Sequence, residues 1–232
     1  MDVLLDCIDE IALDGLDGCP IQELWKHLEE RRPPFPFKLD DRAKQFLWKA
    51  IARTLDIEFF ALAEPFPHIF GTKQGERTDN ESAHHQAQNP LDQFPGPLRY
   101  NNEFKLISEE DTGIRGSCPS YHVRKNISED VRGHSSGDCV NLETAYERWG
   151  DCLVMVASQE LREKALLGLE CDPHVTLTDI QYCLLEHVGQ ARYNGRVQKT
   201  IGSSFFKMDS RSTFHHLKRL RKRHLVTMQV KY

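Results

Sequence analysis

Residues 71–97 (GTKQGERTDNESAHHQAQNPLDQFPGP) interrupt the chain and limit what can fold on either side of them. They contain few large apolar side chains and many Gly, Pro, Asn, Gln and Ser residues. Such a stretch cannot bury enough apolar surface to offset the conformational entropy lost on ordering it. The sequence therefore predicts a disordered linker over residues 71–98 between two separately patterned regions.

Before the linker, apolar residues recur at the three- and four-residue spacing of helices. This spacing predicts helices over residues 3–12, 20–31 and 40–54. The last of these follows the extended segment PPFPF (33–37) and is capped by Asp40 or Asp41. The apolar run at 57–62 then predicts a strand. Three helices followed by a strand is the element order of a winged helix, which we therefore predict for residues 1–70.

The pattern is weaker over residues 99–173, which we interpret as a connecting region with mixed α/β elements. A short strand at 99–107 precedes a loose stretch at 112–139. Asn141 and Ser158 are placed to cap two further helices, and the apolar run 152–157 between them predicts a buried strand.

Residues 174–232 repeat the order of helix, helix, helix and strand. Thr178 or Thr176 opens a helix that ends at Gly189, and a short helix at 196–202 follows. A basic helix from about Asp209 to His224 precedes the alternating run at 225–230 (LVTMQV). We therefore predict a second winged helix whose hairpin is truncated at Tyr232. The fold class that follows is mainly α with short β-hairpins (α+β): two winged-helix modules joined by a partly disordered connecting region.

Charge separates the two ends of the chain more sharply than its net value of −5 suggests. Residues 196–232 hold ten Lys or Arg and one acid, a net charge of +9, so the rest of the chain carries −14. A basic terminus of this kind indicates a nucleic-acid contact, although a solvated basic helix has the same composition. Residues 1–30 instead hold nine acids against Lys26 alone, which would repel phosphate. We therefore expect the first module to dock protein.

The basic helix separates its side chains by chemistry. Phe214, Leu217, Leu220 and Leu225 fall within one apolar sector at 100° per residue. The opposite sector collects Arg211, Ser212, His215, Arg219, Lys222 and Arg223. This is the layout of a recognition helix, whose exposed face enters the major groove of duplex DNA while its apolar face packs on the other helices. Lys199 and Arg223 are predicted to contact phosphates at the periphery. A basic helix that meets an acidic protein surface is the alternative.

Other classes of function lack a motif in this sequence. No GxSxG, P-loop, HExxH or GxGxxG occurs, so we expect neither an enzyme nor a bound cofactor. Cys118, Cys139 and Cys152 lack the paired short spacing of a structural zinc site, so no metal is expected. Cys7, Cys152 and Cys183 lie in apolar stripes and are predicted to fill the core. The acidic start MDVLLDCIDE predicts no signal peptide, and we expect no membrane contact.

Several collinear stretches resemble the amino-terminal part of the largest, B-block-binding subunit of general transcription factor IIIC. They are LDGLDG (13–18), PPFPF (33–37), GIRGSC (113–118), RKNISEDVR (124–132), AYERWG (145–150), VASQELREKALLG (156–168) and DIQYCLLEHVGQARYNGRVQK (179–199). The similarity covers nearly the whole chain except about 64–98. Because family subunits are far longer than this chain, the resemblance implies a fragment or a shortened relative.

The resemblance also implies a function. Members of this family are nuclear proteins with several winged helices and no enzymatic activity of their own. They act with other transcription factor IIIC subunits on the internal promoters of transfer-RNA genes and recruit the RNA polymerase III machinery. The expected partners of this chain are accordingly promoter duplex DNA, the other subunits and that machinery. A winged-helix scaffold that only binds protein within a transcription complex is the rival hypothesis.

Overall fold

The amino-terminal helices form where apolar spacing predicts them. The computed structural model describes residues 3–65, 104–133, 138–168 and 176–229. Helices α1 (Val3–Leu13), α2 (Ile21–Glu30) and α3 (Asp41–Arg53) are followed by strand β2 (Ile57–Ala61). The Asp40 side chain accepts a hydrogen bond from the Ala43 amide at 2.8 Å and so caps α3. The predicted order of three helices and a strand is confirmed.

The partner of β2 comes from far along the chain. Strand β6 (Leu153–Ala157) pairs antiparallel with β2, in a register that sets Ile57 opposite Ala157 and Ala61 opposite Leu153. The short strands β1 (Cys19–Pro20) and β5 (Lys125–Asn126) extend this sheet, whose strand order is β1-β6-β2-β5. The apolar run predicted as a buried strand is thus buried at every position of β6. It lies in the same sheet as the strand of the first module.

Three short helices cover this sheet and the amino-terminal helices. Helices α5 (Ser128–Arg132) and α6 (Leu142–Trp149) pack against α3, and α7 (Gln159–Leu167) packs against α1. The Trp48 indole donates to the Val140 carbonyl at 2.7 Å, which fixes the start of α6 over α3. Asn141 caps α6 and Ser158 caps α7, as predicted.

A small ribbon lies between the two ends of the molecule. Strand β3 (Leu106–Ile107) pairs antiparallel with β4 (Gly116–Ser117), and the single-turn helix α4 (Glu109–Thr112) joins them. Of the strand predicted at 99–107, only Leu106 and Ile107 form a strand in the described part, and residues 99–103 lie outside it. The ribbon packs against α8 on one side and against the turn Gly15–Asp17 on the other.

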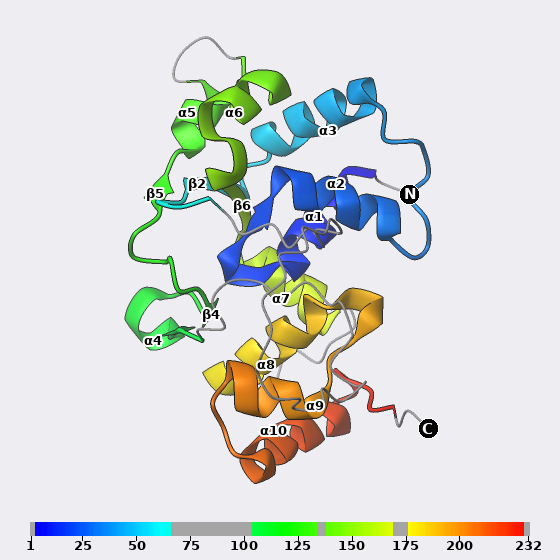
Figure 1. Cartoon of the computed structure of the whole chain (residues 1–232), viewed down its shortest axis with the longest axis vertical. Coiled ribbons are helices and arrows are strands. Elements are labelled where there is room, and N and C mark those ends of the chain that lie inside the picture. Colours follow the sequence, from blue (N-terminus) through cyan, green and yellow to red (C-terminus); the bar gives the residue numbers. More distant parts are fainter. Residues whose placement is uncertain (1–2, 66–103, 134–137, 169–175, 230–232) are drawn as a thin grey trace, which may run out of the picture.

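Three helices form the carboxyl-terminal end (Figure 1). Helix α8 (Asp179–Gly189) begins at Thr178 in a complete capping box with Gln181. The short helix α9 (Gln198–Thr200) runs into one π-helical turn, Ile201–Phe205, and α10 (Ser210–Lys222) follows. These helices enclose a second apolar core, separate from that of the amino-terminal helices, which includes Tyr182, Leu184, Leu185, Ile201, Phe206, Leu217 and Leu220. The predicted α+β class is confirmed.

The strand predicted at 225–230 is wrong over its described residues. Residues 225–229 are irregular, and the Leu225 amide bonds back to the Leu220 carbonyl at the end of α10. An alternating pattern forms a strand only where a neighbouring strand completes its hydrogen bonds, and the described chain places none beside this segment. The linker predicted at 71–98 lies outside the described residues. Among the residues that are described, no helix is long and apolar enough to cross a membrane.

Candidate nucleic-acid interface

Helix α10 begins at a well-satisfied cap. One carboxylate oxygen of Asp209 accepts hydrogen bonds from the Arg211 and Ser212 amides, both at 2.9 Å. The other oxygen accepts the Ser212 hydroxyl at 2.6 Å. These hydrogen bonds hold the pKa of Asp209 below its ordinary value, with the Ser212 hydroxyl as the largest cause. The first turn of the helix is therefore fixed by Asp209, and Ser212 serves this cap.

The buried side of α10 differs from the predicted apolar sector in one position. Thr213, Leu217 and Leu220 are buried, and they face α8 and the turn 201–205. Phe214, predicted to face inward, is 47% exposed. Thr213 can take the buried position because its hydroxyl donates to the Asp209 carbonyl at 3.0 Å. The Thr213 hydroxyl is thus hydrogen-bonded, and the buried face of α10 is centred closer to Thr213 than to Phe214.

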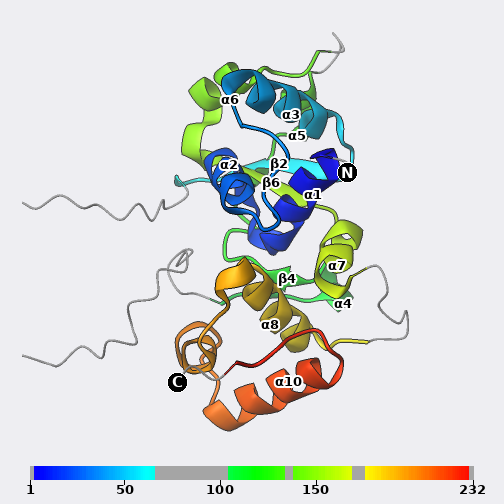
Figure 2. The same cartoon turned by 90° about the vertical axis from the view of Figure 1, so that its right-hand side faces the viewer.

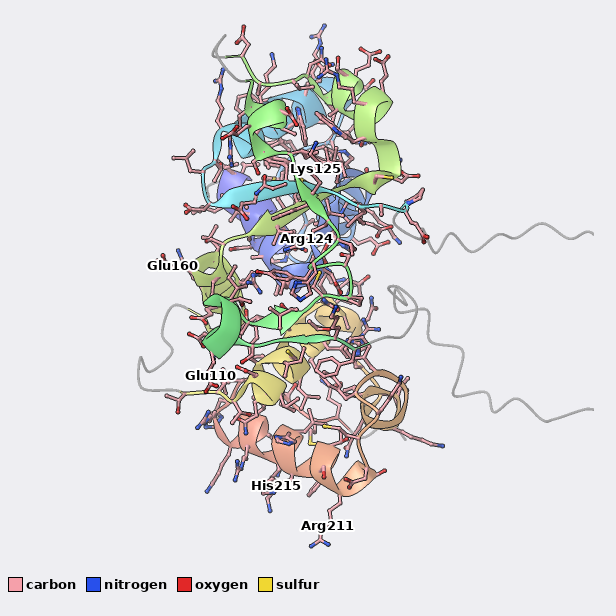
Figure 3. The ribbon with its side chains drawn as sticks, turned by 90° about the vertical axis from the view of Figure 1, so that its left-hand side faces the viewer. Glu110, Arg124, Lys125, Glu160, Arg211 and His215 are labelled. Atoms are coloured by element: carbon pink, nitrogen blue, oxygen red, sulfur yellow. The ribbon has the colours of Figure 1, made fainter. Side chains whose placement is uncertain are left out.

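The side of α10 opposite Thr213, Leu217 and Leu220 carries cations and one histidine, with exposed Phe214 at its edge. Arg211, His215, Arg219 and Lys222 are all exposed, as predicted. Figure 3 shows Arg211 and His215 pointing away from the rest of the molecule. Lys218 is exposed on the same face and was not among the predicted contacts. Its position one turn before Lys222 could have identified it on the same helical wheel.

The remaining predicted contacts lie away from the centre of this face. Arg223 is exposed after the end of α10, and its guanidinium donates to the Thr176 carbonyl at 2.6 Å. Lys199 is exposed on α9, outside the recognition helix. Partly buried His216 lies beside the face, and its pKa is lowered by burial and by the neighbouring His215 and Arg219. Ser212, Arg223 and Lys199 thus lie at the margin of the outward face. Its centre is formed by Arg211, His215, Lys218, Arg219 and Lys222.

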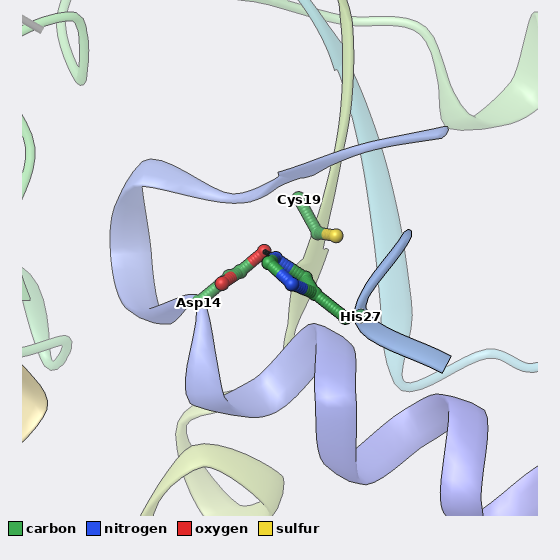
Figure 4. A group of neighbouring side chains, drawn as sticks. All are labelled: Asp14, Cys19 and His27. Carbon is green, nitrogen blue, oxygen red and sulfur yellow. Dashed lines mark ion pairs between the residues drawn. The ribbon is translucent and has the colours of Figure 1, made fainter. Parts of the chain in front are cut away.

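A second cluster of polar side chains lies in the amino-terminal core (Figure 4). Asp14, Cys19 and His27 are buried, and one potential ligand atom from each lies within 4.8 Å of the others. The Asp14 carboxylate is 3.4 Å from His27 Nε2 through one oxygen and 3.0 Å from Arg192 Nη2 through the other. Cysteine spacing did not point to this group, because it contains a single cysteine beside an aspartate and a histidine. The contact with Arg192 already neutralises the carboxylate, so the cluster is first of all an ionic network.

Comparison with known proteins identifies two matching regions. Residues 178–231 match the family described as the B-block binding subunit of TFIIIC. Residues 1–94 match the family described as General transcription factor 3C polypeptide 1, winged-helix domain. The first match contains α8, α9 and α10, and the second contains α1, α2, α3 and β2.

Individual relatives match along almost the full chain. The human protein named General transcription factor 3C polypeptide 1 is 37% identical over 229 residues, which cover 99% of this chain and 11% of the human protein. The mouse and rat proteins of the same name are 36% and 35% identical over the same length. The chain therefore spans about a tenth of the length of the curated relatives it matches.

Proposed function

Because this chain belongs to the family of the B-block-binding subunit of general transcription factor IIIC, we propose that its carboxyl-terminal helices bind duplex promoter DNA through α10. The observation that carries this proposal is the uniform charge of the outward face of α10. Arg211, Lys218, Arg219 and Lys222 are all exposed there, and the only acid in residues 196–232 is Asp209, which is engaged at the cap.

The geometry of α10 suits the major groove. Its buried side rests on α8 and the turn 201–205, so the opposite side is free to enter a groove about as wide as one helix. Arginine can bind the O6 and N7 atoms of guanine in bidentate fashion, and lysine neutralises phosphates as a point charge. We assign base or phosphate contacts to Arg211, His215, Lys218, Arg219 and Lys222. Ser212 acts through the cap, and Arg223 and Lys199 contact peripheral phosphates.

In the cell, this activity would place the chain in the nucleus. Its DNA target would be the internal promoter of transfer-RNA genes, and it would act there with other subunits of the factor and with the RNA polymerase III machinery. We assign it no enzymatic activity.

Replacing Arg219 with Ala tests the assignment. If Arg219 reads a base edge, the variant should lose about 1–3 kcal/mol of binding free energy on the cognate promoter duplex and discriminate less against a scrambled duplex. The matched control is Arg53→Ala, which removes an exposed arginine from α3 at the other end of the molecule. Fluorescence anisotropy titrations on both duplexes measure the effect. Equal losses on the two duplexes would show a phosphate contact alone, and no loss would remove Arg219 from the interface.

Salt dependence separates DNA binding from the protein-scaffold hypothesis. A DNA contact gives a slope of log K against log salt concentration of about −0.9 for each phosphate neutralised. A chain that fails to bind either duplex at low salt would instead favour a scaffold in which α10 meets an acidic protein surface.

A further inference from the structure

One buried carboxylate connects both ends of the molecule. Glu186, near the end of α8, is 1% exposed. Its Oε1 accepts a hydrogen bond from the Leu16 amide at 3.0 Å, and its Oε2 accepts one from the Ser117 amide at 3.0 Å. The Arg162 guanidinium of α7 lies 3.4 Å from Oε1. A single side chain of the carboxyl-terminal helices thus binds α7, the ribbon and the turn after α1.

Two glycines make room for this carboxylate. A Cβ atom at Gly15 would lie 2.5 Å from the Glu186 carboxyl carbon, and one at Gly116 would lie 3.1 Å from Glu186 Oε1. Gly15 also has φ of +73°, a conformation that other residues adopt only with strain. The motifs LDGLDG and GIRGSC therefore have a structural explanation. Gly15 and Gly116 let the backbone approach Glu186 closely enough for the Leu16 and Ser117 amides to donate to its carboxylate.

Arg192 forms the second half of this connection. It follows α8, and its guanidinium donates to Glu10 Oε2 at 2.6 Å, to the Glu10 carbonyl at 3.0 Å and to Asp14 Oδ1 at 3.0 Å. The side-chain Nε2 of the neighbouring Gln190 donates to the Asp14 carbonyl at 3.0 Å. Residues that follow α8 thus bind both acidic side chains and backbone carbonyls of α1 and of the turn after it.

This connection bears on the candidate interface because α8 supports α10. In Figures 1 and 2, α8 lies between the amino-terminal helices and α10, and α10 packs directly on it. Any rotation of α8 relative to the amino-terminal module would carry the exposed face of α10 with it. The orientation of that face is therefore set by contacts that involve none of its own residues.

We propose that Glu186 and Arg192 act as positioning residues, which hold α10 in one orientation relative to the amino-terminal winged helix so that α10 meets DNA with its orientation already fixed. This inference rests on the proposed function of α10. We name the contacts of Glu186, Gln190 and Arg192 with Glu10, Asp14, Leu16 and Ser117 the junction. A junction formed before binding lowers the entropy that binding must otherwise remove.

Hydrogen exchange of the whole chain tests the junction without DNA. Glu186→Gln keeps the shape of the side chain but places an NH2 donor where the carboxylate accepts bonds, and Arg192→Ala removes the bonds to Glu10 and Asp14. Both variants should exchange the Leu16 and Ser117 amides roughly tenfold faster or more. Protected amides of α3 and α10 should stay slow, and Arg53→Ala should behave as the unaltered chain. Unchanged exchange at Leu16 and Ser117 would overturn the junction. Arg192→Lys, which keeps the charge, provides the same test should Arg192→Ala unfold.

Titration of a promoter duplex then tests the positioning role. Both junction variants should bind the cognate duplex about tenfold more weakly, because the orientation of α10 is no longer fixed before binding. The slope of log K against log salt concentration should stay unchanged, because every phosphate contact of α10 remains. Faster exchange without loss of affinity would refute the positioning role. Failure of the unaltered chain to bind would refute the proposed function instead, while the exchange data would still decide the junction.

Discussion

At the scale of single residues, the strongest local determinants are the caps. Asp40, Asn141, Ser158, Thr178 and Asp209 each accept a backbone amide at the start of a helix. Asn141 and Ser158 were predicted as caps, and Asp40 and Thr178 each as one of two candidates, because a cap depends only on a short polar side chain and the next three residues. Cysteine packing was predictable in part. Cys7 and Cys183 are buried as expected, whereas Cys152 is only half-buried beside the start of β6.

Asp209 supplies a test at this scale. Asp209→Ala removes the acceptor for two amides and the Ser212 hydroxyl, so the variant should unfold at lower urea concentration at neutral pH. The folded-state pKa of Asp209 is depressed below its ordinary 3.8. Its stabilising effect is therefore complete above that value and is lost as the pH falls through the folded pKa. Urea titrations at about pH 6 and about pH 3 should show the difference from the unaltered chain shrinking with acid. Asp209→Asn keeps an acceptor without the titration. A difference that grows with acid would contradict this account.

At the scale of elements, close packing decides which face of a helix is buried. Gly202, in the π-helical turn, lies so near α10 that a Cβ atom there would be 2.4 Å from Thr213 Oγ1. This approach explains why Thr213 is buried while Phe214 is exposed. The periodicity of α10 alone favoured Phe214, because hydrophobicity ranks side chains but carries no information about the shape of the neighbouring helix. The sequence thus located α10 and most of its exposed face. The contact with Gly202 shows that Thr213, and not Phe214, belongs to the buried face.

Gly202→Ala tests that contact. The added methyl group collides with the Thr213 hydroxyl and should destabilise the chain by about 1–3 kcal/mol, the usual cost of overpacking. The double variant with Thr213→Ala should recover part of this loss, because the nearest atoms of the collision are gone. Chemical denaturation of the two variants and of Thr213→Ala alone gives the coupling energy. Strict additivity would show that the two residues do not interact.

At the scale of the whole molecule, the sheet joins segments that the sequence separates. The predicted first module ended near residue 70, yet β2 forms its main pairing with β6 at 153–157. Trp25 and Trp48 likewise donate hydrogen bonds to Tyr146 and Val140. The amino-terminal helices therefore depend on residues from the connecting region for their sheet and for two of their largest side chains.

A fragment comparison tests this dependence. Residues 1–70 alone should fail to unfold cooperatively, because β2 loses its partner and the apolar residues Ile57 and Phe59 lose their cover. Residues 1–168, which include β6 and α6, should show a cooperative thermal transition by circular dichroism. A cooperative transition of the shorter fragment would show that the helices suffice without the sheet.

The sequence by itself determined the longer helices, most of their caps, the basic face of α10 and the family of the chain, whereas α4 and α5 formed where no helix was predicted. These features depend on residues within a few positions of one another, or on collinear motifs, and both can be seen without coordinates. Only the tertiary structure decided the pairing of β2 with β6, the burial of Thr213 in place of Phe214, and the junction at Glu186 and Arg192. Each of these joins surfaces whose fit depends on three-dimensional shape. The need for glycine at positions 15 and 116 can be recognised only in the folded structure, where the Glu186 carboxylate lies against both of them.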